Sequence, residues 1–227
     1  MSKKIIITGH SKGIGKKLAE YFVNKGHIVY GISRTKSSNK KIHQFKCDIE
    51  NSKKIKEIFN KINKFDILIN NTSISSFSKD PYKNFRKIIN TNLIGTFNCC
   101  QRSTNHIKGG SIINIASINA YMAFPNNPGY VSSKGGVKSL TQSLALDYAK
   151  YDIRVNSVSP GYINEGMSSK SFKNKEKKKE RLNRMVIKRW GKAEDLFGII
   201  DYLISSKSSY VTGQDFLIDG GWTIKGL

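Results

Sequence analysis

Apolar and polar positions alternate in blocks along the chain, and each block has the length of one strand or one helix. Short, continuous apolar runs predict strands buried on both faces. They occur at residues 4–8, 27–32, 66–70, 111–115 and 153–159, with a last one at 216–218. Stretches with helical spacing lie between them, at residues 14–25, 52–60, 82–102, 129–149 and 194–203. This alternation predicts an α/β fold with three αβα layers, a doubly wound parallel sheet of the Rossmann type.

Two segments depart from the alternation. Only nine residues, SRTKSSNKK, separate Ile32 from Ile42. Since a parallel crossover normally needs a dozen or more residues, the helix there should be short or absent. Residues 162–190 carry ten Lys or Arg against three Glu, and we expect them to form a mobile, mostly helical lid over the substrate. The length of 227 residues suits one domain, so residues 1–227 are predicted to form a single binding and catalytic unit.

The apolar runs and the cysteines indicate the compartment. No run approaches the about 20 residues that span a bilayer, and the three isoleucines near the N-terminus are too few for a signal peptide. We therefore expect a cytoplasmic protein that inserts into no membrane. Cys47 and the adjacent Cys99 and Cys100 are odd in number and poorly spaced for a disulfide or zinc site. They are predicted to be reduced and buried, and no metal site is expected.

The net charge of +23 has two interpretations. A basic surface attracts polyanions such as nucleic acid. However, only seven of the 39 basic residues are arginine, which leaves 32 lysines, and isoleucine, asparagine and serine are also abundant. This bias is typical of an AT-rich genome, whereas phosphate-reading surfaces favour arginine forks. We therefore expect no specific nucleic-acid binding.

A glycine-rich loop follows the first predicted strand and opens the first predicted helix. It reads Thr-Gly-His-Ser-Lys-Gly-Ile-Gly from Thr8 to Gly15. Glycines allow a tight turn and close approach of the backbone to a ligand, and the amides of a helix N-terminus favour a pyrophosphate. The loop therefore predicts a dinucleotide site.

Tyr130 and Lys134 lie one helical turn apart, and Ser117 precedes the tyrosine by thirteen residues. The spacing alone is weak evidence because lysine is so common here, and Tyr21 with Lys25 gives a chance match. Together with the upstream serine and the glycine-rich loop, the pair looks like a proton-transfer site.

Nearly the whole chain resembles the short-chain dehydrogenase/reductase family, and in particular its 3-oxoacyl-(acyl-carrier-protein) reductase-like members. The loop spacing Thr-Gly-x-x-x-Gly-x-Gly carries the resemblance, together with NIAS, YVSSK, TNLIGTF and YVTGQDFLIDGG. The resemblance implies that Asn92, Ser117, Tyr130 and Lys134 are catalytic. Tyr130 would exchange a proton with the substrate oxygen, Ser117 would hydrogen-bond that oxygen, and Lys134, on the same helix face, would lower the pKa of the phenol. It also implies that Asn92 holds a water linking Lys134 to solvent, that Lys134 holds the nicotinamide ribose, and that Asp48 contacts the adenine.

The expected contacts of the cofactor are Gly9, Ser11, Lys12, Gly13, Ile14, Gly15, Arg34, Asp48, Ile49, Asn70, Tyr130, Lys134, Pro160, Gly161 and Ile163. Arg34 follows the second strand, where a cation favours the 2′-phosphate of NADP and an aspartate would favour NAD. We therefore predict a preference for NADP(H), with NAD(H) as the alternative.

Three residues depart from the family pattern. Thr72 and Ser73 stand where the family has alanine and glycine, and Glu165 stands where it has a threonine that binds the nicotinamide carboxamide. These changes put the fit of the cofactor in question and raise the alternative of an inactive member.

The leading hypothesis is an NADPH-dependent carbonyl reductase that acts on a small ketone and forms a dimer or tetramer, as the resemblance implies. The basic lid favours an anionic or carrier-linked substrate, or is a solvated lysine-rich helix face. Tyr121 and Phe124 are expected to line the pocket, or to pack. One alternative is a reductase or dehydrogenase of keto-sugars or nucleotide sugars. A second is a non-catalytic nucleotide- or polyanion-binding protein.

Overall fold

A sheet of seven parallel strands forms the middle layer of the molecule, and the computed structural model describes residues 2–225 except the side chain of Lys170. The order across the sheet is β3-β2-β1-β4-β5-β6-β7. The strands are β1 (Lys4–Thr8), β2 (Ile28–Ser33), β3 (His43–Lys46), β4 (Ile67–Asn70), β5 (Ser111–Ile115), β6 (Arg154–Pro160) and β7 (Asp215–Ile218). The chain winds outward from β1 to β3 and then returns to β4 beside β1. Loops leaving β1 and β4 therefore diverge and open a crevice at the carboxyl edge.

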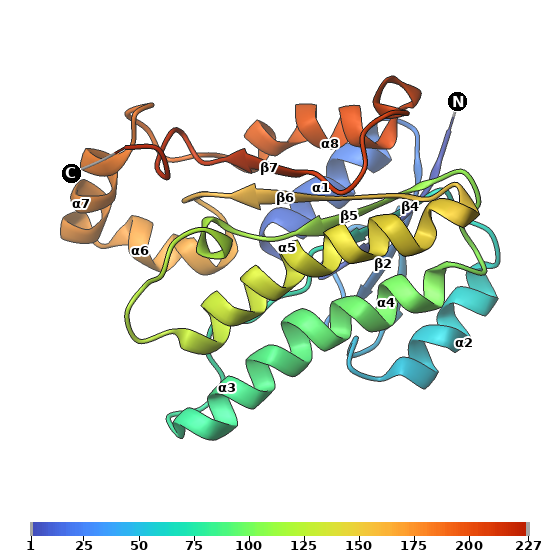
Figure 1. Ribbon diagram of the computed structural model, residues 1–227, viewed down its shortest axis with the longest axis horizontal. Helices are drawn as coiled ribbons and strands as arrows, with labels where there is room; N and C mark the ends of the chain where they lie inside the picture. The colour runs from blue at the N-terminus through green and yellow to red at the C-terminus, as the bar shows by residue number, and fades with distance from the viewer. Residues whose placement is uncertain (1, 226–227) are drawn as a thin grey trace.

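Helices cover both faces of the sheet (Figure 1). One apolar cluster joins α1 (Gly13–Asn24) and α8 (Phe197–Ile204) to the sheet, and another joins α2 (Ser52–Ile62), α4 (Gly95–Ser103) and α5 (Pro128–Tyr148) to the opposite face. The helix α3 (Pro81–Ile89) continues into α4 through a π-helical turn, Asn90–Ile94. Two further helices, α6 (Ser169–Lys173) and α7 (Lys175–Arg184), lie beyond the carboxyl ends of β5 and β6 (Figure 1).

The predicted α/β architecture is confirmed, and the strands predicted at 4–8 and 111–115 match β1 and β5 at both ends. No helix lies between β2 and β3, as the short connection indicated. The sequence missed two features, the strand β3 itself and the π-turn inside the helix predicted at 82–102. All three cysteines are free and buried. Among the described residues, no helix is long and apolar enough to cross a membrane.

His10 links the glycine-rich loop to the connection between β2 and β3. Its ring is 1% exposed and lies over Gly31, where an added Cβ would come within 2.3 Å of a ring atom. His10 Nε2 is 3.0 Å from Oε1 of Gln44, whose amide donates to the carbonyls of Ser37 and Asn39. A glycine is therefore required at position 31, and the histidine packed on it supports the loop that carries Arg34.

Gly31→Ala should lower the free energy of unfolding by about 1–3 kcal/mol, because the new methyl group overlaps the His10 ring. Removing the ring makes room, so Gly31→Ala combined with His10→Ala should cost less than the sum of the two single changes. Denaturant unfolding of the three variants measures this coupling. Strictly additive losses would show that the ring does not occupy the space above Gly31.

Candidate active site

A cavity of about 720 Å³ opens at the carboxyl edge of the sheet, where the loops after β1, β2, β4, β5 and β6 meet. This volume is typical of small-molecule and cofactor sites. Seventeen residues were predicted from the sequence to be catalytic or to contact the cofactor. Fourteen of them line the cavity: Gly9, Ser11, Lys12, Gly13, Ile14, Arg34, Asp48, Ile49, Ser117, Tyr130, Lys134, Pro160, Gly161 and Ile163. The remaining three, Gly15, Asn70 and Asn92, stand behind this lining.

The glycine-rich loop has the backbone geometry that a phosphate group requires. Gly9 (φ +72°) and Gly13 (φ +57°) adopt left-handed conformations that favour glycine. Lys12 is the N-cap of α1, and its side chain makes no capping hydrogen bond. The first amides of α1 therefore face the cavity without a side-chain cap. An anion placed there would meet these N–H groups and the positive end of the helix dipole.

Gly15 and Asn71 hold the two diverging loops together from behind. An added Cβ at Gly15 would lie 2.3 Å from Nδ2 of Asn71 and 2.4 Å from the carbonyl oxygen of Gly9. Asn71 Nδ2 donates to the carbonyls of Thr8 and Gly9, at 3.2 and 3.3 Å. The Thr8 hydroxyl accepts the backbone N–H groups of Asn71 and Thr72. Gly15 thus permits this packing and does not itself face a ligand.

Asn70 points away from the cavity, and its neighbour Asn71 lines it instead. Asn70 pairs in register with Asn114 of β5, and its amide donates to Oδ1 of Asn114 at 2.9 Å and to Sγ of Cys100. Alternation along a strand sends consecutive side chains to opposite faces. Asn70, as the last residue of β4, therefore belongs to the core, and the sequence analysis chose the wrong member of the pair for the cavity lining.

Ser117, Tyr130 and Lys134 come together on one side of the cavity. Ser117 follows β5 in extended conformation, and Tyr130 and Lys134 lie on α5, one turn apart. The Lys134 side chain is 3% exposed, and its Nζ donates to the carbonyl oxygen of Ile115 at 2.7 Å. The same Nζ is 5.6 Å from the centre of the Tyr130 ring. The lysine therefore reaches from the helix to the end of β5, beneath the tyrosine.

Burial dominates the acid–base behaviour of this pair. Loss of solvation lowers the pKa of Lys134 to about 7, since the neutral amine is easier to bury than the ammonium. Burial also raises the pKa of the Tyr130 phenol, and the hydroxyls of Ser117 and Ser73 lower it in part. The Ser117 hydroxyl also donates to Oδ1 of Asn119 at 3.1 Å, and that of Ser73 has no partner among the described residues. The predicted lowering of the tyrosine pKa by Lys134 is therefore wrong for the protein alone, because the lysine charge is itself weakened by burial.

Asn92 supports the site from the π-turn between α3 and α4. Its Oδ1 accepts the backbone N–H of Ile74 at 2.8 Å, and its Nδ2 donates to the Ile74 carbonyl and to Oγ of Ser133. The Ser133 hydroxyl in turn donates to the carbonyl of Tyr130. The carboxamide thus ties the loop after β4 to the helix that carries the tyrosine. A water-binding role for Asn92 stays a prediction.

Arg34 is exposed, lines the cavity and makes no ion pair among the residues that the structure describes. The loop around it is fixed, since Oγ of Ser11 lies 2.9 Å from Oγ1 of Thr35 and Ser33 donates to the Thr35 carbonyl. Asp48 lines the same part of the cavity, and its Oδ1 accepts the N–H of Glu50 at 3.1 Å.

The departures from the family pattern lie on the cavity wall. The hydroxyls of Thr72 and Ser73 are buried without a hydrogen-bond partner, and both residues line the cavity. Such orphaned polar atoms fit a ligand that carries many hydrogen-bonding groups, as a dinucleotide does. Glu165 also lines the cavity, as does Phe124, whereas Tyr121 donates its hydroxyl to Asp215 at 2.6 Å and is not part of the lining. The residues present therefore fit a dinucleotide.

Comparison with known proteins identifies relatives along nearly the whole chain. The family model described as Enoyl-(Acyl carrier protein) reductase matches residues 9–223. Glucose 1-dehydrogenase 2 of Bacillus subtilis is 31% identical over 98% of this chain and 95% of its own. The 3-oxoacyl-(acyl-carrier-protein) reductase FabG of Staphylococcus epidermidis is 31% identical over 97% of this chain and 99% of its own. Among solved structures, 4-hydroxyisoleucine dehydrogenase complexed with NADH superimposes with a TM-score of 0.90 at 32% identity, covering 99% of this chain and 100% of that one.

The buried lysine should leave a signature in the pH dependence of stability. The pKa of Lys134 is about 7 in the folded protein against 10.5 for an ordinary lysine, so the unfolded chain binds more protons between these values. The free energy of unfolding should therefore rise with pH across that window, relative to a Lys134→Met variant, by up to a few kcal/mol at about 1.4 kcal/mol per pKa unit.

Denaturant unfolding of both proteins from pH 6 to pH 10, without nucleotide, measures this difference. Titrations elsewhere in the chain cancel in the comparison. Parallel stability curves for the two proteins would mean that the lysine keeps an ordinary pKa.

Proposed function

Because this chain is an oxidoreductase of the short-chain dehydrogenase/reductase family, we propose that it uses NADPH to reduce a ketone to a secondary alcohol. One observation carries the proposal. Ser117, Tyr130 and Lys134 line the same cavity as the glycine-rich loop and Arg34, so one ligand-sized space joins proton-transfer groups to an anion-binding loop. A tyrosine and a lysine with a purely structural role would not need to share a cavity with an anion-binding loop.

Each side chain takes a separate task in this proposal. Ser117 donates a hydrogen bond to the carbonyl oxygen of the substrate, where negative charge develops. A nicotinamide held in this cavity would provide the hydride for the carbonyl carbon. Tyr130 gives its phenolic proton to the same oxygen, which completes the alcohol and leaves a phenolate. Lys134 would hold the ribose of the cofactor, and the N-terminus of α1 would bind its pyrophosphate.

Lys134 suits the recovery of the tyrosine proton. With a pKa of about 7, its amine exchanges protons readily near neutral pH. Its ammonium form would also stabilise the neighbouring phenolate, since opposite charges at short range favour ionisation. Asn92 would hold the tyrosine backbone in place through Ser133, at 3.0 Å from the carboxamide.

Arg34 supports the choice of NADPH over NADH. It is an exposed cation with no ion-pair partner among the described residues, and it follows β2 where the 2′-position of the adenosine ribose would lie. Lys12 adds a second positive charge to the same cavity. NADH is the alternative cofactor, which the NADH complex of the 4-hydroxyisoleucine dehydrogenase relative favours.

The relatives support two substrate classes. One named relative reduces 3-oxoacyl groups on acyl carrier protein, and another oxidises glucose, so a ketone and a sugar are both candidates here. The ketone suits the reductive direction of the reaction and the sugar suits the oxidative direction.

Exposed apolar side chains on α3, α4 and α5 support assembly into a dimer or tetramer. Among them are Tyr82, Phe97 and Leu146.

Tyr130→Phe should lower kcat/KM for ketone reduction by a factor of 10² to 10⁴, since the variant keeps the ring and loses the proton donor. Tyr21→Phe provides a matched control. Tyr21 has the same spacing to a lysine, but its hydroxyl donates to Asp201, which also pairs with Lys25 at 2.6 Å. Loss of NADPH absorbance with a panel of ketones measures both variants. Equal rates for Tyr130→Phe and the parent protein would rule out the proton-transfer role.

Arg34→Asp should reduce the ratio of kcat/KM for NADPH to that for NADH by at least tenfold, because a carboxylate repels the 2′-phosphate and accepts a ribose hydroxyl. Arg86→Asp, on the exposed surface of α3 outside the cavity lining, makes the same change in net charge and should leave the ratio unaltered. If the two variants shift the ratio equally, Arg34 does not read the phosphate.

A further inference from the structure

Arg181 on α7 is the basic residue of the lid segment 162–190 that lines the cavity, among the residues that the structure describes. Its side chain is 19% exposed, and it lines the cavity together with Ser171 and Phe124. Its Nε is buried without a hydrogen-bond partner among the described residues. A buried N–H of a charged group without an acceptor is costly, so the described residues leave this guanidinium incompletely hydrogen-bonded.

Aromatic side chains fix the guanidinium in place. Its Cζ lies 4.8 Å from the centre of the Tyr162 ring, and Tyr162 packs edge-on against Trp190 and Trp222. The remaining polar contacts of Arg181 are weak. Nη1 is 3.4 Å from the Lys177 carbonyl and 3.4 Å from Oε2 of Glu180, whose side chain is 68% exposed. The group is therefore held by stacking against the cavity wall, and the described residues give it no strong anionic partner.

The other charges near the cavity do not satisfy Arg181. Glu165 lines the same space but forms no ion pair with it within 4.0 Å. The residue after Glu165 packs on the glycine-rich loop, since an added Cβ at Gly13 would lie 3.1 Å from Cα of Gly166. Glu165 thus belongs to the segment over the cofactor loop. Arg181 stands against Tyr162, which follows β6.

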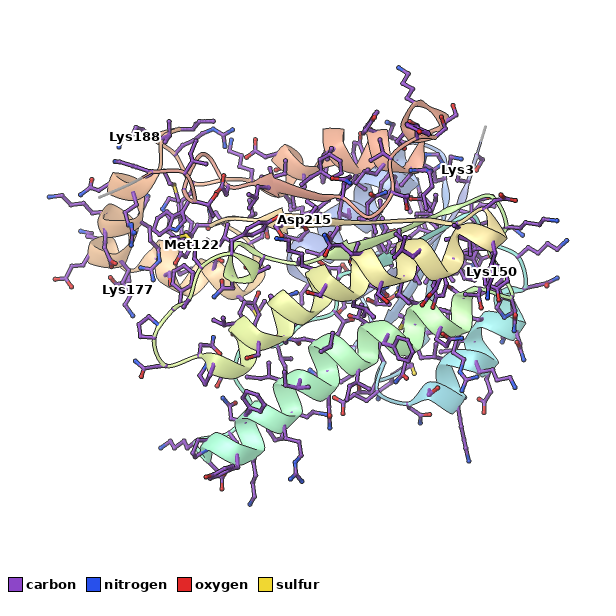
Figure 2. The ribbon with its side chains drawn as sticks, viewed as in Figure 1. Lys3, Met122, Lys150, Lys177, Lys188 and Asp215 are labelled. Atoms are coloured by element: carbon purple, nitrogen blue, oxygen red, sulfur yellow. The ribbon has the colours of Figure 1, made fainter. Side chains whose placement is uncertain are left out.

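The position of Arg181 is not explained by the general excess of lysines on the protein surface. Figure 2 shows Lys177 and Lys188 at the α6–α7 end of the molecule and Lys3 and Lys150 at the opposite end, so lysines extend into solvent at both ends. Arg181 differs from them because its side chain is mostly buried and lines the cavity. A planar guanidinium in such a wall matches a carboxylate, which it can bind with two parallel hydrogen bonds.

We propose that Arg181 binds a carboxylate carried by the substrate itself, so that the protein acts on an oxo acid or on the corresponding hydroxy acid. This inference rests on the proposed function, because it concerns the substrate of the same cavity. Arg181 is then a specificity-determining residue. The proton chemistry stays with Tyr130 and Ser117, and a neutral ketone remains a poorer substrate.

Matched pairs of substrates and variants test the proposal. The substrates are 3-oxobutanoate, 4-oxopentanoate and 5-oxohexanoate, each compared with its methyl ester, which keeps the ketone and removes the charge. The variants are Arg181→Leu and, as a control, Arg184→Leu on the same helix. Arg184 stacks on Trp222 at 5.2 Å and is not part of the cavity lining, so its removal costs the same charge and a similar contact.

The parent protein should prefer at least one acid over its ester in kcat/KM by about tenfold or more, as expected for a charge-assisted pair. Arg181→Leu should abolish that preference by weakening reduction of the acid while changing the ester less than about twofold. Arg184→Leu should keep the preference. No acid preference in the parent protein, or an equal preference in Arg181→Leu, would overturn the proposal.

A binding measurement separates this proposal from the proposed function. Tryptophan fluorescence, with Trp190 and Trp222 beside Tyr162, reports saturable binding of the oxo acids in the presence of NADP⁺ at constant ionic strength. Binding that Arg181→Leu weakens at least tenfold and Arg184→Leu does not would support the carboxylate site even where no ketone is reduced. Reduction of the esters without acid binding would retain the proposed function and overturn the role of Arg181.

Discussion

The site depends on one unfavourable interaction, the burial of the Lys134 amine between α5 and the end of β5. Taking an ammonium out of water is costly, and one hydrogen bond of 2.7 Å to the Ile115 carbonyl offsets only part of that cost, so burial lowers the pKa of Lys134 to about 7. An ordinary surface lysine would be charged and solvated. The fold therefore fixes a group that changes protonation near neutral pH directly beneath Tyr130, and the surrounding elements must hold it there.

Those elements are held by small polar anchors at the diverging strand ends. The Thr8 hydroxyl accepts hydrogen bonds from two backbone N–H groups of the loop after β4, and the Asn71 side chain of that loop donates back to the end of β1. Asn92 hydrogen-bonds both Ile74 and Ser133 and so links the same loop to α5. Parallel strands alone place loops at one edge, but they do not fix the spacing between them. These side-chain bonds to backbone do, and they explain why the cavity walls carry so many buried polar residues.

The sequence predicted the layers of the fold well because buried parallel strands are continuous apolar runs, and β1 and β5 match at both ends. It missed β3, because His43 to Lys46 contain a single apolar residue, Phe45, and lie partly exposed at the sheet edge, so the continuous apolar signal is absent. Most of the proposed site was found because ordered motifs fix strand ends and helix starts. Asn70 and Asn71 could not be distinguished, since the residue at which β4 ends decides which amide faces the core.

In this chain, the positions of the rare arginines indicate function better than those of the abundant lysines. Lysine is so abundant here that a lysine at a given place in the sequence is weak evidence of function, whereas the contacts of the seven arginines can be compared one by one. Arg154 donates to backbone carbonyls, Arg189 pairs with Asp195 and Arg184 stacks on Trp222. Among the described residues, Arg34 and Arg181 are the arginines that line the cavity, the first just after β2 and the second against Tyr162. The phosphorylated cofactor and the acidic substrate that we propose would each bring a negative charge for one of these two guanidinium groups.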